Sequence, residues 1–235
     1  IAFRRVNYNF SLQRAIEWAN KLSKPLLIFE PMTIDYPMAS IRFHKFAIEG
    51  IQDIQKQTEK SKAFYFPYVE EKKGIADKLL IELAKNAAVV ITDDYPTYFV
   101  PQMTAEAKGS IQTTYELVDS NGLLPIRIAE KEYVRAHDFR RFMHKNIEDF
   151  LVEVPEKDPL EYLNLKFDEK LIEPILKKYE LVDFNKVNTQ DFLNNLNVDK
   201  SVEVSDVVGG YNAAKSRLDL FTKKGFNDYS KLRSH

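Results

Sequence analysis

Several residues that could contact a ligand lie at the end of, or just after, three apolar segments in the first half of the sequence. Arg5 belongs to the first segment, Glu30 and Met32 follow the second, and Asp93 and Asp94 end a later one. In an open parallel sheet, residues that follow the carboxyl ends of strands meet at one edge, and ligands bind there. We therefore expect a ligand site near these five residues. The first segment is not followed by Gly-x-Gly-x-x-Gly, which argues against a dinucleotide bound in the NAD manner.

The paired aspartates, Asp93 and Asp94, also allow a structural role. Two carboxylates without nearby His or Cys are a poor ligand set for a metal, and an N-cap of the next helix is the favoured interpretation. His137 and His144 are seven residues apart, on one face of a helix, but no third zinc ligand is evident at helical spacing. We expect no metal site. The sequence has no Cys, so it cannot form disulfides, Cys-based zinc sites or thiol nucleophiles.

Two basic clusters leave alternatives open. Arg42 and His44, on a predicted helix, could contact an anion or a cofactor, although a solvated helix face is the favoured interpretation. The second cluster consists of Arg135, Arg140, Arg141 and Lys145. It could bind phosphates or pair with the acidic residues that follow it on the same helix.

Composition and motifs narrow the function classes. The chain has 235 residues, 44% of them hydrophobic, and a formal net charge of −1. A globular, core-forming protein fits these values, and no overall basic field indicates nucleic acid. No nucleophile elbow, kinase signature or P-loop occurs, so no catalytic residue is assigned within this chain. No apolar run reaches 18 residues, so no membrane span is expected.

Five apolar segments predict the strands that position these residues: 1–6, 25–29, 63–69, 87–93 and 111–118. Helical patterns lie between them, the first with Ser11 as its predicted N-cap and with Trp18 in the core. This alternation predicts an α/β fold, a Rossmann-like, doubly wound, five-stranded parallel sheet.

The second half of the sequence has a different character. A basic amphipathic helix is predicted from His137 to about Val152, and residues 155–208 read as an extended linker with short helices, wrapped over the first domain. A last helix begins after Gly209-Gly210 and is expected to turn four residues inward: Ala213, Ala214, Leu218 and Phe221. The expected divisions are 1–130, 131–208 and 209–235.

Several motifs, in the same order along the chain, resemble the DNA photolyase and cryptochrome family. They are Asn9-Phe10-Ser11-Leu12, Ser40-Ile41-Arg42, Ile91-Thr92-Asp93-Asp94-Tyr95-Pro96, Val118-Asp119-Ser120-Asn121-Gly122-Leu123-Leu124-Pro125, Lys131-Glu132-Tyr133, and Gly209-Gly210 with the later Tyr229-x-x-x-Arg233. Within the family they are most similar to class II cyclobutane-pyrimidine-dimer photolyases.

The resemblance implies an antenna-type α/β domain, a long linker and the first helix of an all-helical FAD domain. Because that domain would continue beyond residue 235 and the chain starts without Met, we expect the N-terminal half of a larger protein, inactive alone. Tyr229 would contact FAD near its phosphates, and Arg233 would face DNA. An antenna chromophore, deazaflavin or folate, would occupy the strand-end site near Arg5, Glu30, Met32, Asp93 and Asp94.

The activity implied by the resemblance is that of a deoxyribodipyrimidine photo-lyase, a carbon–carbon lyase that repairs pyrimidine dimers in DNA with light. The dimer must leave the duplex to be reached. The expected state is a monomer in the cytoplasm, associated with the nucleoid in a bacterium. Two alternatives are a cryptochrome-like blue-light photoreceptor and a free-standing Rossmann-like binding module.

Overall fold

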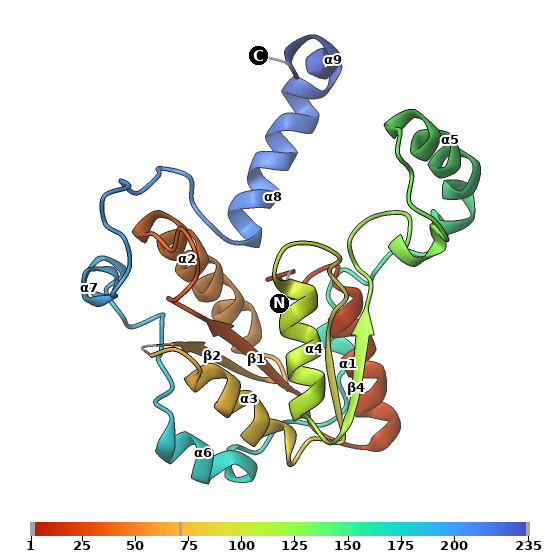
Figure 1. Cartoon of the computed structure of the whole chain (residues 1–235). Helices are drawn as coiled ribbons and strands as arrows, with labels where there is room; N and C mark the ends of the chain where they lie inside the picture. Colours follow the sequence, from red (N-terminus) through yellow and green to blue (C-terminus); the bar gives the residue numbers. More distant parts are fainter. Residues whose placement is uncertain (1–2, 71, 234–235) are drawn as a thin grey trace.

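The first half of the chain alternates helices and strands, as the apolar segments predict. The computed structural model describes residues 3–70 and 72–233. The elements of this half are α1 Phe10–Leu22, β1 Leu27–Met32, α2 Ile41–Thr58, β2 Phe64–Val69, α3 Ile75–Ala84, β3 Val89–Asp93, α4 Val100–Ser110 and β4 Thr114–Val118 (Figure 1).

The strands form two parallel pairs. β1 pairs with β2 from Leu27↔Phe64 to Met32↔Val69, and β3 pairs with β4 from Val89↔Thr114 to Asp93↔Val118. The described residues therefore contain four strands in two sheets, and not the predicted five-stranded sheet. The α/β class and the parallel pairing agree with the prediction.

The missing strand is the one predicted over residues 1–6, of which 1–2 lie outside the described residues. The backbone N–H of Arg5 donates to the carbonyl oxygen of Phe3 at 2.8 Å, a γ-turn contact that takes this segment out of the extended conformation. The Phe3 N–H donates instead to Oδ2 of Asp93 at 3.1 Å, and Arg4 reaches the carbonyl oxygen of Pro31. The segment thus contacts the carboxyl ends of β1 and β3.

The first helix starts differently from the prediction. Asn9, and not Ser11, is the N-cap of α1, and its side chain accepts a hydrogen bond from the Leu12 N–H at 3.0 Å. Ser11 lies inside the helix and faces β3. Trp18 is only half-buried and not fully in the core as predicted, and its indole N–H donates to Glu116 on β4 at 2.8 Å.

The core forms around the inward stripe of α2. Ile48, Ile51 and Ile54 recur at helical spacing and are fully or almost fully buried. They pack in one cluster with Ile16 of α1. A second cluster lies around Phe66 of β2, together with α3.

Residues 155–208 form short helices that lie over the first domain, as predicted, and several of their side chains are also part of its core. The segment contains η3 Pro159–Tyr162, η4 Glu169–Ile172, α6 Glu173–Lys178 and α7 Thr189–Asn195. Leu163, Phe184 and Leu193 are at most 1% exposed and belong to the α1–α2 cluster. The segment returns to α2 at Asp199, whose carbonyl oxygen accepts from the Ile41 N–H at 2.8 Å.

Two helical parts project from the same side of this body (Figure 1). One contains α5 Ala136–Asn146 and η2 Ile147–Phe150, so the predicted basic helix divides into two elements. The other contains α8 Tyr211–Leu220, a π-helical turn Phe221–Gly225, the short η6 Phe226–Asp228 and α9 Tyr229–Leu232.

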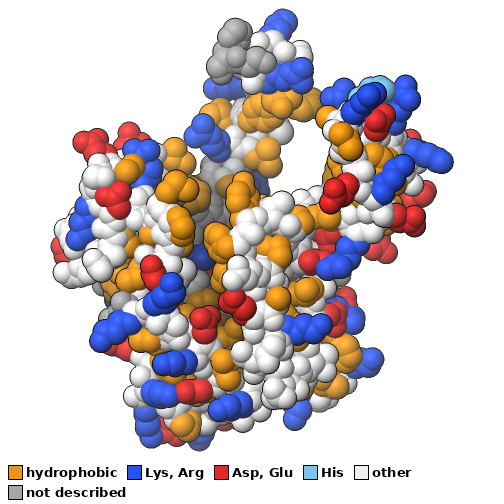
Figure 2. Space-filling view, in the orientation of Figure 1, with side chains coloured by type: hydrophobic (Ala, Val, Ile, Leu, Met, Phe, Trp, Pro, Cys, Tyr) orange, Lys and Arg blue, Asp and Glu red, His pale blue; other side chains and the backbone are white. Residues whose placement is uncertain are grey.

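The prediction that α8 turns apolar residues inward is wrong. None of its described residues is buried, and Leu218 is 56% exposed. Figure 2 shows hydrophobic side chains on the surface of this projection. The helix is held at its start, where the Gly209 N–H donates to Oε2 of Glu49 and the Asn212 N–H donates to Oδ2 of Asp53.

Candidate functional site at the carboxyl ends of the strands

A partly buried hydrogen-bond network surrounds Glu30 on β1. The Tyr65 hydroxyl donates to Oε2 of Glu30 at 2.6 Å, and the Arg4 guanidinium donates to Oε1 at 3.3 Å. Burial and then the negative charge of Glu30 raise the pKa of Tyr65 well above its usual value, so the phenol stays protonated and remains a donor. The carboxylate is therefore compensated by one neutral and one cationic donor.

His44 of α2 lies beyond the end of β1 and is 1% exposed. Its Nδ1 lies 2.8 Å from the Ser40 carbonyl oxygen and its Nε2 3.2 Å from that of Thr33, while its ring stacks on Tyr36 at 5.8 Å. The interpretation of this stretch as a solvated helix face is thus wrong for His44, which points into the core side of α2. Arg42 is exposed and donates to the Glu203 carbonyl oxygen at 2.6 Å.

Asp93 ties the end of β3 to α1. The Ser11 hydroxyl donates to its Oδ1 at 2.6 Å, and the carboxylate is 3% exposed. Neither Asp93 nor Asp94 caps the next helix, because α4 begins at Val100 after Phe99. The N-cap interpretation is therefore wrong for both aspartates.

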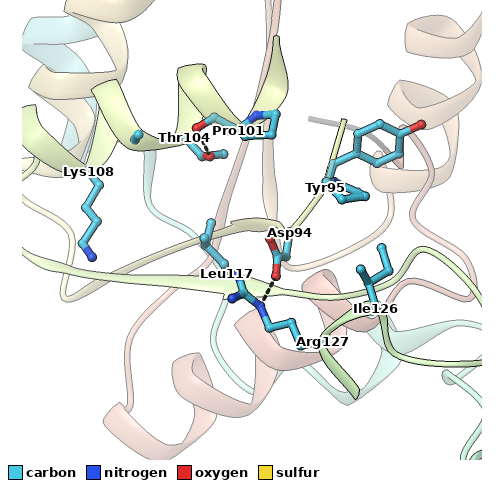
Figure 3. Close-up of a pocket in the computed structure, with 10 residues that line it drawn as sticks. Asp94, Tyr95, Pro101, Thr104, Lys108, Leu117, Ile126 and Arg127 are labelled. Carbon is cyan, nitrogen blue, oxygen red and sulfur yellow. Dashed lines mark hydrogen bonds and ion pairs between the residues drawn. The ribbon is translucent and has the colours of Figure 1, made fainter. Parts of the chain in front are cut away.

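Asp94 lines an open cavity of about 450 Å³ between α4 and β4. Its Oδ2 accepts from Nε of Arg127 at 2.6 Å, and this ion pair forms one side of the cavity (Figure 3). Lys108 of α4 lies at the other end, and within the described part of the chain it has no ion-pair partner. The remaining walls are mainly apolar: Tyr95, Pro96, Pro101, Thr104, Ala105, Leu117 and Ile126.

The five predicted antenna residues lie in different local settings. Met32 is buried at the end of β1, and Glu30 lies in the network with Tyr65. Arg5 does not join them: its guanidinium donates to the carbonyl oxygens of Asn7 and Tyr8. The neighbouring Arg4 contacts Glu30 instead, as described above.

Three further residues that take part in these contacts or line the cavity carry no usable signal in the sequence. Tyr65 lies within an apolar strand segment, Lys108 on a helix with many polar residues, and Arg127 in the short 3₁₀ helix η1 Ile126–Ile128. Their roles depend on which segments the fold brings together. Arg127, for example, is 33 residues from Asp94.

Tyr229 and Arg233, the predicted FAD and DNA contacts, lie together at α9. The Arg233 N–H donates to the Tyr229 carbonyl oxygen at 2.9 Å, which places the two residues one helical turn apart. Tyr229 is 52% exposed, and its ring packs edge-on against Phe221 at 5.8 Å. Arg233 is exposed as well.

The described residues contain no group of three or more His, Cys, Asp or Glu side chains that could hold a metal ion. None of the helices in these residues is long and apolar enough to span a membrane.

The fold is that of an α/β protein with two parallel strand pairs, a cavity beside Asp94 and two projecting helical parts (Figure 1). The chain is similar, over 98% of its length, to a curated protein of Methanothermobacter thermautotrophicus named deoxyribodipyrimidine photo-lyase, with 26% identity over 231 residues. The aligned part is 47% of that protein, so this chain spans about half the length of its relative. No model of a protein family matches the chain. The similarity supports a relationship with the photolyase family.

Proposed function

We propose that this chain forms the N-terminal part of a photolyase-type flavoprotein that repairs pyrimidine dimers in DNA with light. The observation that carries the proposal is the similarity to a protein named deoxyribodipyrimidine photo-lyase over 98% of this chain. Within the family, the motifs of the sequence favour class II. The carbon–carbon lyase activity belongs to the whole protein.

The proposed division of labour follows the chain. Residues 1–130 form the antenna-type domain, 131–208 connect it to the flavin part, and 209–235 begin the helical FAD domain. The projection of α8 from the body and its exposed apolar side chains support this division (Figure 1). Because side chains of residues 155–199 belong to the core, the connecting segment is also a structural part of the first domain.

Tyr229 is proposed to contact FAD near its phosphates, and Arg233 to face DNA. The exposed phenol fits this role, because the hydroxyl has no hydrogen-bond partner among the described residues and its ring is held by Phe221. Bound FAD would supply the electron that opens the dimer. The contribution of this chain would be to position the cofactor and the DNA backbone next to each other.

An antenna chromophore, deazaflavin or folate, is proposed to bind at the strand-end site. The cavity of about 450 Å³ beside Asp94 falls within the range of about 300–1,000 Å³ that is usual for small-molecule sites. Apolar walls and the ammonium of Lys108 suit a planar ligand with an anionic group. Glu30, Met32 and Asp93 lie at the neighbouring strand ends, whereas Arg5 is turned toward its own loop.

The test uses the intact protein. Its visible spectrum reports bound flavin, and an oligonucleotide with one cyclobutane dimer reports repair under blue light, with a dark sample as the control. Light-dependent repair supports the proposal. Flavin photoreduction without repair would indicate a cryptochrome-like photoreceptor, and a protein without flavin would indicate a binding module; either outcome contradicts the proposal.

A further inference from the structure

Helix α5 has one cationic side and one aromatic side. At about 100° per residue, Arg140, Arg141 and Lys145 fall on one side together with His137 and His144, and these five residues are called the α5 cationic face below. All five are exposed. The opposite side carries three apolar residues: Phe139, Phe142 and Met143.

The aromatic side fixes how the helix is oriented. Tyr133, from the segment before the helix, packs against Phe139 at 5.6 Å and against Phe142 at 5.3 Å, and the latter two rings lie 6.3 Å apart. Phe142 and Tyr133 are half-buried in this cluster. Because the aromatic side faces its own lobe, the α5 cationic face points away from it.

The Arg and Lys side chains of this face have no ion-pair partner, whereas several lysines elsewhere in the described residues do. Lys45, Lys177 and Lys215 each form an ion pair with a carboxylate four residues away on their own helix or turn. Within the part of the chain that the structure describes, the side chains of Arg140, Arg141 and Lys145 make no ion pair or hydrogen bond. His137 differs, because its Nδ1 lies 3.6 Å from Oδ1 of Asp138 on the same helix. The pairing with the acidic residues that follow, one of the two alternatives from the sequence, is therefore not what the structure shows.

We infer that the α5 cationic face binds the phosphate backbone of DNA. Its three permanent charges lie within six residues, a rise of about 8 Å along the helix, which matches two or three phosphates at about 3.4 Å per nucleotide of a strand. The choice of DNA as the partner rests on the proposed function. It is supported by Figure 1, in which α5 projects from the same side of the body as α9, which carries Arg233.

An anionic membrane is a less suitable partner. Interfacial helices insert an apolar face beside their cations, but here the apolar side is used by Tyr133, Phe139 and Phe142. Glu148 and Asp149 also follow the helix directly on η2 and would face the same anionic surface. A narrow phosphate strand can contact the cations without approaching these carboxylates.

The experiment compares three proteins: wild type, Arg140→Gln/Arg141→Gln and Arg140→Lys/Arg141→Lys. Gln, Lys and Arg have similar helix propensities, so α5 should form in all three. Binding of a fluorescein-labelled 20-base-pair duplex is followed by anisotropy between 50 and 300 mM salt. Loss of two phosphate contacts should reduce the slope of log affinity against log salt by about 1.8 and weaken binding about 60-fold at 0.1 M salt. The lysine variant should keep the slope.

Two results would overturn the inference. One is an unchanged slope in the glutamine variant. The other is a loss of binding to vesicles with anionic lipid, or to polyglutamate, that equals or exceeds the loss for the duplex. Repair of dimers by the intact glutamine variant at saturating DNA tests the proposed function separately, because it depends on flavin chemistry and not on the salt slope.

Discussion

The attachment of α8 gives the sharpest prediction. A Cβ added at Gly209 would lie 2.0 Å from the carbonyl oxygen of Phe46, a backbone atom of α2, against about 3.3 Å for a normal C···O contact. Gly209→Ala must therefore move the start of α8 by about 1 Å or more. The Gly209 N–H would then lose its 2.8 Å bond to Glu49, and the bond from Asn212 to Asp53 would be strained.

Two hydrogen bonds to partly exposed carboxylates are worth about 3 kcal/mol together, at the low end of about 1.5–3 kcal/mol each. That energy corresponds to about a 100-fold larger population with α8 detached. Hydrogen exchange of peptides covering residues 203–216 should accelerate by this factor. Urea unfolding followed by the fluorescence of Trp18, in the body, should change much less.

Gly109→Ala is the matched control for this variant. A Cβ at Gly109, near the end of α4, would meet nothing within 4 Å, so this change should leave exchange at 203–216 unaltered and stabilise α4 by up to about 1 kcal/mol. Wild-type exchange in Gly209→Ala would refute the argument, because it would mean that the start of α8 accepts a side chain.

Three further predictions concern single side chains. The hydrogen bond from Arg14 lowers the pKa of Glu116 below 4.5 in the folded protein. The ionised Glu116 therefore stabilises the folded state fully above about pH 4.5, and this stabilisation is lost as the pH falls through the lower folded-state pKa. Trp18 fluorescence should change in that window, and Glu116→Gln should abolish the change. Tyr65→Phe removes one of two donors from a partly buried carboxylate and should lower the free energy of unfolding by about 1.5 kcal/mol, measured in urea; no loss would contradict the network described. In the intact protein, Arg233→Ala should reduce the salt slope of DNA binding by about 0.9 with flavin occupancy unchanged, whereas an unaltered slope would leave the residue without a phosphate contact.

The β–α alternation could be predicted because each apolar segment contains enough branched and aromatic residues to require burial. Residues 87–93 and 63–69, for example, contain β3 and β2 almost to the residue. The strand predicted over 1–6 is not found in its described part, residues 3–6, where the carboxylate of Asp93 takes the N–H of Phe3 and no ladder forms among the described residues. Sequence periodicity does not report such partners.

The candidate site was only partly accessible to sequence reasoning. The expectation that ligands bind at strand carboxyl ends stays a prediction; the sequence did place Asp94 directly after a strand and Glu30 near the end of another, because this depends only on strand position and direction. The rule could not distinguish between the adjacent arginines, because the direction in which each side chain points decides whether Arg4 or Arg5 reaches Glu30. The inward orientation predicted for α8 is wrong. A stripe of apolar residues at helical spacing shows that one face of a helix is apolar, but it does not show which part of the chain covers that face.

The return of residues 155–199 to the first domain has a consequence for the order of events during protein synthesis. Leu163, Phe184 and Leu193 cover one face of α1 and α2. This face is fully covered only after the strand bridge between Ser40 and Asp199 can form. At about 5–20 residues per second, the ribosome takes about 4–16 s to advance from residue 118 to residue 199. During that interval a nascent chain with all four strands already made still exposes an apolar surface, which is the state that chaperones bind. Codon usage over this stretch therefore sets how long the unfinished domain exposes this apolar surface.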